Sequence, residues 1–215
     1  MGVKTAMLVC GDVETDLAAA LAGAADGADP DGASALVSLL YPPHRVRPDG
    51  DDPWELVEAV YPPEGHAYAL STPDVDVICD RAFMIDRPSL LPEHLVAAST
   101  GRRLVLHAMH SVVDWFAFAV WEDGELVRAL SLAPDDGILE DLGERLPFEE
   151  PYWAGSFPVA ADRGEAYPLP FHPLELGERA LYEFFGFAFE GFDGDEGVEW
   201  RVDPEDVRLF GFEVA

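Results

Sequence analysis

The WEDGEL stretch at residues 121–126 constrains the fold more than any other part of the chain. An Asp-Gly pair between two apolar runs is typical of the type I′ turn in a two-residue hairpin loop. We therefore expect strands at 114–122 and 125–132 to pair antiparallel, with Glu122 opposite Glu125. The further pairs in this register are Val120 with Val127, Phe118 with Ala129, Trp121 with Leu126, Ala117 with Leu130 and Trp115 with Leu132. Both faces of the hairpin are apolar, so it is predicted to lie inside a sheet that is covered on both sides.

Other segments show the periodicity of strands or helices. Further strands are predicted at 3–10, 66–70, 75–79, 103–109 and 207–214. Helices are predicted after a cap at Asp12, at 33–41, at 92–99, and from Pro173 to a stop at Gly186. This mixture predicts an α+β fold with a mixed or mostly antiparallel central sheet and helices packed on it.

Two segments are predicted to lack regular elements. Residues 42–53 (PPHRVRPDGDDP) are rich in Pro, Gly and Asp, which indicates a flexible loop. Residues 133–173 contain seven prolines, but aromatic residues are interleaved with them, so we expect an ordered loop that packs across the sheet. Because no stretch separates two independent cores, residues 1–215 are predicted to form a single domain.

Acidic residues dominate the charge of the chain. Forty-two Asp and Glu oppose 13 Lys and Arg, which gives a formal net charge of −29. Such a field repels nucleic acids and anionic lipid surfaces and attracts basic proteins. We therefore expect no nucleic-acid or membrane partner, and the charge favours a basic protein partner. The plainer alternative is that the acidic excess keeps the protein soluble, or reflects a GC-rich or salt-adapted genome.

The two cysteines and the N-terminus bear on the cellular location. The N-terminal apolar run is about five residues long, too short for the core of a signal peptide. No run approaches the roughly 18 apolar residues of a membrane span. Cys10 and Cys79 lie far apart in apolar runs, as expected for buried thiols in a reducing compartment. The protein is therefore predicted to be cytoplasmic.

The stretch LHAMHSVVDW at 106–115 carries the strongest candidate for a catalytic or metal site, formed by His107, His110 and Asp114. Two imidazoles and a carboxylate suit a divalent metal ion or acid–base chemistry. In a regular strand, however, His107 and His110 point to opposite faces. A bend at 110–113, which would pair residue 109 with 114 and 107 with 116, would bring His110 and Asp114 to the mouth of the hairpin. The alternative is that each His is satisfied by a structural partner and that Asp114 fixes the turn.

Three further residues, Trp115, Trp153 and His172, are candidate binding residues. His172 immediately precedes the last predicted helix, so its structural alternative is to close that helix. Cys79 is a candidate nucleophile with a nearby histidine as base, although a buried structural thiol fits its apolar run better. No established catalytic, nucleotide-binding or calcium-binding motif is complete in the sequence, and no cofactor is predicted beyond the possible divalent metal.

A likeness to other proteins is carried by three stretches of the sequence. They are HAMHSVVDWFAFAVWEDGELVRALSL, PFEEPYWAG and YPLPFHPLELGE. These stretches resemble an actinobacterial family of conserved hypothetical proteins that carry a domain of unknown function. The resemblance covers most of the chain and implies a cytoplasmic bacterial protein. It supplies no catalytic residue.

Three hypotheses about function follow from the sequence. The first is a non-catalytic, inhibitor-like or immunity-like module that binds a basic protein partner, because the charge is extreme and no catalytic motif is complete. The alternative is a hydrolase-type enzyme that uses His107, His110 and Asp114, with or without a metal ion. The third is a structural or oligomeric scaffold without a site. The sequence does not define the oligomeric state.

Overall fold

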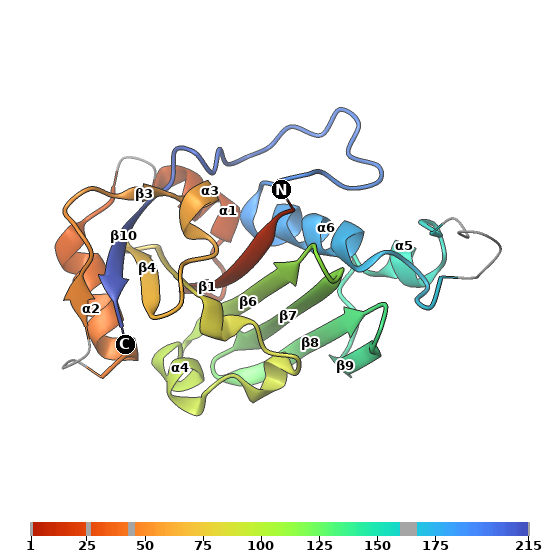
Figure 1. Cartoon of the computed structure of the whole chain (residues 1–215), viewed down its shortest axis with the longest axis horizontal. Coiled ribbons are helices and arrows are strands. Elements are labelled where there is room, and N and C mark those ends of the chain that lie inside the picture. Colours follow the sequence, from red (N-terminus) through yellow and green to blue (C-terminus); the bar gives the residue numbers. More distant parts are fainter. Residues whose placement is uncertain (1, 25–26, 43–45, 160–166, 215) are drawn as a thin grey trace.

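The computed structural model describes residues 2–24, 27–42, 46–159 and 167–214. These residues form one sheet of ten strands and six α-helices (Figure 1). Every strand pair described in the sheet is antiparallel, so the predicted α+β fold with a mostly antiparallel sheet is confirmed. Within the described part of the chain, no helix combines the length and the apolar character of a membrane span.

The strands follow the order β2-β10-β4-β5-β1-β6-β7-β8-β9 across the sheet, and β3 also pairs with β10. Their bounds are β1 (Lys4–Asp12), β2 (Arg47–Pro48), β3 (Trp54–Glu55), β4 (His66–Ser71), β5 (Val75–Asp80), β6 (Arg102–His110), β7 (Trp115–Glu122), β8 (Glu125–Ala133), β9 (Gly137–Gly143) and β10 (Arg208–Glu213). The helices are α1 (Leu17–Gly23), α2 (Pro30–Leu40), α3 (Leu56–Ala59), α4 (Glu93–Ala98), α5 (Glu150–Trp153) and α6 (Pro173–Phe185), with short 3-10 turns η2 (Arg81–Phe83) and η3 (Pro88–Leu90).

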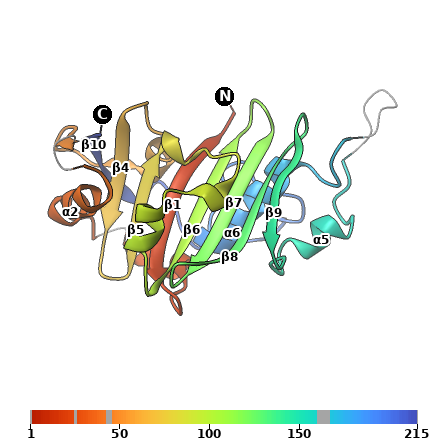
Figure 2. The same ribbon diagram turned by 90° about the horizontal axis from the view of Figure 1, so that it is seen from below.

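Alternate residues of the central strands enter two apolar clusters, one on each face of the sheet. In β6, Val105 and Met109 belong to the first cluster, whereas Leu104 and Leu106 belong to the second. The first cluster includes residues of α1 and α6, and the second includes residues of α2 and α4. Figure 2 shows α6 behind β6, β7 and β8. The central strands are therefore buried on both faces, as their apolar sequence predicts.

The contact between α6 and the sheet is close because α6 has a glycine, Gly177, in its N-terminal half. A Cβ placed on Gly177 would lie 3.1 Å from Phe116 Cδ2 and 3.2 Å from Met109 Sδ. The backbone of α6 therefore reaches the side chains of β6 and β7 directly, and its carbonyl groups come within hydrogen-bonding range of that face.

The predicted hairpin turn is present, but its register is only partly right. Asp123 and Gly124 have positive φ values of 51° and 79°, as a type I′ turn requires, and Glu122 pairs with Glu125. A β-bulge lies between the Trp121–Leu126 and Val120–Arg128 pairs, with Val127 as the extra residue of β8, so Val120 pairs with Arg128 rather than Val127. The predicted pairs beyond Trp121 were wrong because a bulge adds one residue to one strand only. The shift puts Arg128 on the face of the first apolar cluster.

Two predicted helix starts are corrected by the structure. Asp12 ends β1, and Asp16 is the N-cap of α1, where its side chain accepts hydrogen bonds from the backbone N–H groups of Ala18 and Ala19. The second helix begins at Pro30 after an Asp29 cap, three residues before the predicted start at 33. An Asp–Pro start combines a side-chain cap with a residue that needs no N–H partner, and this outweighed the apolar pattern on which the prediction rested.

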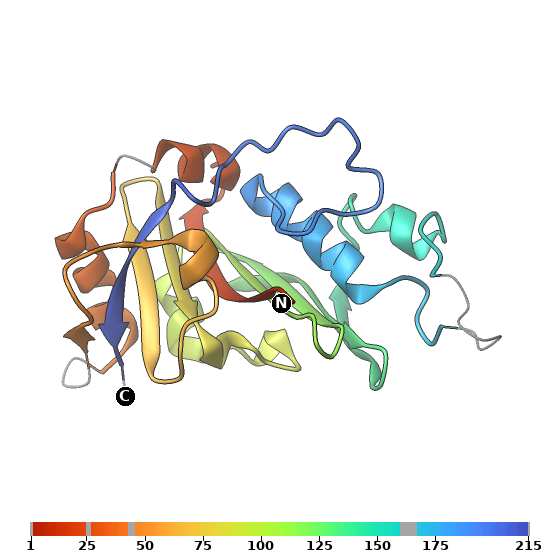
Figure 3. The same ribbon diagram turned by 45° about the horizontal axis from the view of Figure 1, so that its top comes forward.

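The last predicted helix is confirmed at both ends. The α6 helix begins at Pro173 and ends before Gly186, whose φ of 82° is left-handed. After α6 the chain runs back toward α1 before it enters β10, as Figure 3 shows. An ion pair of 2.7 Å between Arg201 Nη1 and Asp16 Oδ2 ties this return segment to the start of α1.

Both predicted loop segments contain regular elements. Residues 42–53 include the two-residue strand β2, and residues 133–173 include β9 and α5. The prediction missed β9 because its sequence, GILEDLG, lacks the β-branched alternation of a strand. Pairing with β8 extends it nonetheless. Residues 43–45 and 160–166 of these two segments lie outside the described residues.

Candidate functional site

His107 is a buried structural residue on the face of β6 that α6 contacts. Its side chain is fully buried, with Nε2 3.0 Å from the carbonyl oxygen of Gly177 and Nδ1 2.9 Å from Thr5 Oγ1. A carbonyl can only accept, so Nε2 carries the proton and Nδ1 accepts from the Thr5 hydroxyl. Burial lowers the pKa of His107 to about 4, and the ring is therefore neutral near pH 7. Both nitrogens are already used, so neither is available to a metal ion or a substrate.

His110 lies at the end of β6 on the opposite face, as strand alternation predicts. The strand continues further than expected, because His110 pairs with Trp115 and Met109 pairs with Phe116. The predicted pairing of residue 109 with 114 and of 107 with 116 was therefore wrong, since the turn lies at 111–114. His110 Nδ1 accepts from the backbone N–H of Val112 at 3.3 Å. Partial burial, followed by the charge of Lys4, lowers the pKa of His110.

Asp114 fixes the turn and faces His172 rather than the other two histidines. Its φ of 48° is left-handed, a conformation that Asp tolerates better than most residues. Asp114 Oδ2 lies 3.6 Å from His172 Nε2. His172 is the N-cap of α6, because its Nδ1 accepts from the backbone N–H of Leu174 at 3.3 Å. The ring stacks on Tyr167 at 5.8 Å between centroids, so His172 acts as a cap held between two neighbours.

The structure therefore separates His107, His110 and Asp114. His107 and His110 point to opposite faces of the sheet, and Asp114 turns toward His172. Among the residues that the structure describes, no group of three or more His, Cys, Asp or Glu side chains is placed to hold a metal ion. The spacing of these residues in the sequence suggested a cluster, but the alternation of side chains along β6 places the two histidines on opposite faces of the sheet.

Trp153 is mainly a packing residue of α5. Its ring lies perpendicular to Phe171 at 5.0 Å between centroids, and the guanidinium of Arg145 lies 3.9 Å from the ring centre. The indole Nε1 donates to Glu149 at 3.4 Å. The aromatic face that a ligand would use is therefore covered by the protein's own side chains.

Cys79 does not have the environment of a nucleophile. The side chain is fully buried in β5, and burial raises the pKa of its thiol far above the usual value. Cys10 and Cys79 are both free and buried, as the apolar runs around them predict. They face opposite sides of the sheet, because Cys79 belongs to the first apolar cluster and Cys10 to the second.

His110 and Trp115 instead line a cavity of about 300 Å³ at the end of β6, β7 and β8. Trp115 is only 6% exposed and forms part of the apolar floor with Ala133. The full lining is Met84, Asp86, His110, Val113, Trp115, Ala133, Asp135 and Asp136. We call this the acidic cavity, because three exposed aspartates from two separate segments stand around an apolar floor.

The aspartates of the acidic cavity are not neutralised by neighbours within the described residues. Asp86, Asp135 and Asp136 form no ion pair and no side-chain hydrogen bond there, unlike Asp141 and Glu149, which both bind Arg128. Three unpaired carboxylates over an apolar floor form a site that suits a cation with an apolar stem, such as the side chain of Lys or Arg.

Sequence reasoning missed these three aspartates. Asp135 and Asp136 lie in the PDDG turn between β8 and β9, and Asp86 follows η2 more than 45 residues earlier. The PDDG turn was a visible signal, because acidic residues after a strand lie at an end of the sheet. Asp86 carried no such signal, since its approach to the β8–β9 turn depends on the path of the chain between η2 and η3.

The fold and these sites define an α+β protein with one antiparallel sheet, apolar clusters on both faces and an acidic cavity at one end of its central strands. Residues 5–212 match the family model described as a family of unknown function, DUF6928, and the chain belongs to that family. This confirms the expected membership of an uncharacterised domain family across nearly the whole chain. No curated protein and no solved structure matches the chain.

Proposed function

We propose that this protein is a non-catalytic binding module that captures a basic segment of a protein partner in the acidic cavity. The observation that carries the proposal is the set of three aspartates, without partners in the described part of the chain, around the apolar floor formed by Trp115 and Ala133. A Lys or Arg side chain would place its charge among Asp86, Asp135 and Asp136 and its methylene stem against the floor.

The charge of the whole chain supports the same partner. A net charge of −29 attracts a basic protein over a distance of about one Debye length and raises its rate of association. The cavity would then supply the local selectivity that overall charge lacks. His110 contributes a neutral wall, because its lowered pKa keeps it from adding a positive charge near neutral pH.

The exposed apolar residues beside the cavity fit a protein partner better than a free cation. Val112 and Val113, in the turn between β6 and β7, are 73% and 53% exposed, and Val113 lines the cavity itself. A partner that inserts a basic side chain would cover this turn. The proposed module would act by occlusion, as an inhibitor or immunity protein does, and requires no catalytic group.

The proposal is tested with a defined probe, an oligo-arginine peptide, added to the ¹⁵N-labelled protein. We expect the indole N–H signal of Trp115, assigned with a Trp115→Phe variant, to shift on titration. The affinity should fall steeply between about 50 and about 200 mM salt. The triple variant Asp86→Asn, Asp135→Asn, Asp136→Asn should bind at least about tenfold more weakly, a loss of about 1.4 kcal/mol of binding free energy.

A matched control separates the cavity from overall charge. The variant Asp51→Asn, Asp52→Asn, Glu199→Gln removes the same number of charges from exposed residues outside the acidic cavity. It should change the affinity by no more than about twofold, or about 0.4 kcal/mol of binding free energy. If the two triple variants lose the same affinity, binding depends only on the net charge of the protein, and the proposed site is rejected.

We further propose a cytoplasmic location and a bacterial, actinobacterial origin. The free, buried thiols of Cys10 and Cys79 support a reducing compartment. The origin rests on the resemblance in sequence alone. Recovery of the native protein from a secreted fraction rather than from the cytoplasmic fraction of the cell would argue against the proposed location.

A further inference from the structure

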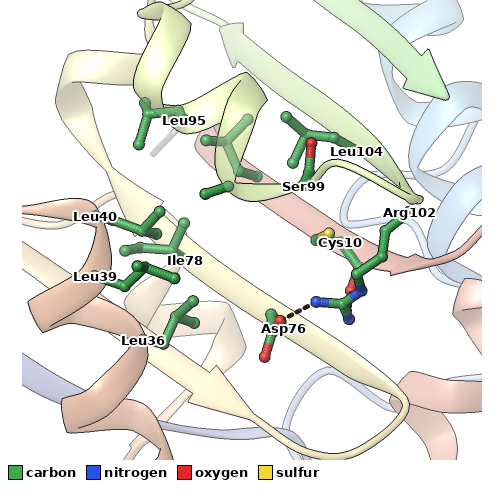
Figure 4. Close-up of a pocket in the computed structure, with 12 residues that line it drawn as sticks. Cys10, Leu36, Leu39, Leu40, Asp76, Ile78, Leu95, Ser99, Arg102 and Leu104 are labelled. Atoms are coloured by element: carbon green, nitrogen blue, oxygen red, sulfur yellow. Dashed lines mark hydrogen bonds and ion pairs between the residues drawn. The ribbon is translucent and has the colours of Figure 1, made fainter. Parts of the chain in front are cut away.

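A second cavity lies on the face of the sheet where α2 and α4 meet, away from the acidic cavity. Its volume is about 100 Å³. Figure 4 shows leucines of α2 on one side of it and Leu95 of α4 on another, with Ile78 of β5 between them. The lining is Leu8, Cys10, Leu36, Leu39, Leu40, Asp76, Ile78, Leu95, Ala98, Ser99, Arg102 and Leu104. We call it the leucine cavity.

Most of the leucine cavity is apolar. Its floor includes Leu8, Ile78 and Leu104, all nearly fully buried in the second apolar cluster. Leu39 at its edge is 68% exposed, which makes the entrance apolar as well. Burial raises the pKa of the Cys10 thiol to about 11, so this side chain is also neutral. A cavity of this size is smaller than the roughly 150 Å³ cavity that accepts benzene, so it suits a chain of about four or five carbons.

One end of the leucine cavity is polar and is formed by Arg102 and Asp76. The guanidinium of Arg102 pairs through Nη1 with Asp76, and its Nη2 donates to the backbone carbonyl of Cys10 at 3.1 Å. Asp76 also accepts from the Ser71 hydroxyl at 2.5 Å. A guanidinium has five N–H donors. Only two Arg102 nitrogens, Nη1 and Nη2, have acceptors among the described residues, so the guanidinium keeps N–H donors that no protein group uses there.

We propose that the leucine cavity binds a short aliphatic molecule whose neutral oxygen accepts a hydrogen bond from Arg102. The aliphatic chain would lie between α2 and α4, and a ketone, ester or amide oxygen would meet the unused N–H donors. This site is independent of the acidic cavity and of any basic partner, because the two cavities share no lining residue.

The charge around Arg102 favours a neutral head group over a carboxylate. Burial lowers the pKa of Arg102, but the hydrogen-bonded carboxylate of Asp76 outweighs it and raises this pKa, with a smaller contribution from Asp12 on β1, so two negative charges lie near the guanidinium. The net charge of −29 adds long-range repulsion for any anion. A primary amine lacks an acceptor in its charged form, so it cannot use the remaining donors.

Room for a longer chain exists beside the leucine cavity. A neighbouring cavity of about 210 Å³ shares Leu40 and Leu95 with it and continues toward Tyr41 and Asp80. These two shared leucines, one from α2 and one from α4, form the wall between the two spaces. A ligand with a longer chain would have to displace them, so binding is expected to weaken once the chain exceeds the leucine cavity.

The test uses pentan-2-one, pentylamine and pentanoate as probes, with methyl NMR of the leucine-labelled full chain. We expect pentan-2-one to shift the methyl signals of Leu36, Leu40 and Leu104. Pentylamine should not shift them, and pentanoate should bind at least about fivefold more weakly than the ketone. An Arg102→Gln variant should weaken binding of the ketone at least about fivefold. Ala98→Leu, which adds bulk at the wall, should abolish the shifts.

Two matched control variants distinguish a loss of binding from a loss of folding. Arg103→Gln changes the neighbouring arginine on the other face of β6, where Arg103 pairs with Glu122, and should leave binding unchanged. Ala97 and Ala98 are both exposed, but only Ala98 lines the leucine cavity, so Ala97→Leu should leave binding unchanged. The proposal is overturned by an absence of methyl shifts with the ketone in the wild-type protein. It is equally overturned if binding persists in Ala98→Leu, or if pentanoate or pentylamine binds as well as the ketone.

Discussion

The guanidinium of Arg128 and the carboxylate of Glu149 form a fully buried, bidentate ion pair between β8 and the start of α5. Arg128 Nε lies 2.9 Å from Glu149 Oε1, and Nη2 lies 2.6 Å from Oε2. Neither side chain is exposed. Asp141 of β9 receives a third bond from Arg128 at 2.5 Å, and the backbone N–H of Leu146 donates to Glu149 at 2.8 Å. This pair ties the segment after β9 to the sheet and satisfies both charges.

Removing one partner of this pair should destabilise the protein strongly. A Glu149→Gln variant leaves the Arg128 charge buried with only Asp141 to balance it, so we expect the free energy of unfolding to fall by about 3 kcal/mol. The measurement is urea denaturation near neutral pH. The matched control is Glu122→Gln, which breaks the half-exposed pair with Arg103. That change should cost less than about 1 kcal/mol, and equal losses in both variants would contradict the assigned role.

Two buried groups are predicted to give opposite pH dependences of stability. Burial raises the pKa of Glu178 from 4.5 to about 7 and lowers the pKa of His107 from 6.5 to about 4. As the pH falls from 7 to 4.5, folded Glu178 takes up a proton first, so its contribution to stability rises. As the pH falls from 6.5 to 4, His107 protonates first in the unfolded chain, so its contribution falls. The contributions should largely cancel in the wild-type protein.

Single variants should uncover each contribution. Relative to wild type, Glu178→Gln should lose stability on acidification below about pH 7, and His107→Gln should gain it below about pH 6.5, each by roughly 3 kcal/mol in total. Urea denaturation at several pH values between about 4 and 8 measures both differences. Glu178 accepts a backbone bond from Phe189 at 2.7 Å, which Gln can preserve. Differences that do not change with pH would contradict the assigned pKa shifts.

Gly143 at the end of β9 should tolerate no side chain. Its φ is 80°, and a Cβ would lie 2.0 Å from the backbone oxygen of Val127 in the β8 bulge. Gly137 at the start of β9 has a similar φ of 75° but no atom within 4 Å of the Cβ position. Gly137→Ala should cost about 1–2 kcal/mol from the left-handed backbone alone. Gly143→Ala should cost clearly more, and calorimetry of the two variants compares them directly. If both variants lose the same free energy of unfolding, the backbone around Val127 can move to make room for the Cβ at position 143.

Local sequence patterns predicted most of the strands and the last helix. The sequence predicted three features correctly: the Asp123–Gly124 turn, the hairpin that is apolar on both faces, and the start of α6 at Pro173 and its end before Gly186. Each of them depends on the backbone preferences of a few neighbouring residues. The strand parity that divides His107 from His110 was readable for the same reason. It was the best evidence against the cluster that their spacing suggested.

The sites depended on features that no local pattern records. The bulge at Val127 of β8 turned Arg128 into the core, where it meets Glu149 from 21 residues further along the chain. The acidic cavity brings Asp86 beside Asp135, and the leucine cavity brings Arg102 of β6 beside Asp76 of β5. His172 was placed correctly before a helix, but its neighbours Asp114 and Tyr167 come from the path of the tertiary chain.

The sequence by itself therefore determined the fold class, the central hairpin, the buried thiols and the acidic character of the chain. These follow from short-range backbone preferences, from the alternation of apolar residues and from composition. The tertiary structure alone decided which polar groups are paired and which stand unpaired around a cavity. Pairing joins residues far apart in the chain, and a one-residue shift in strand register changes the face that every later side chain of that strand occupies.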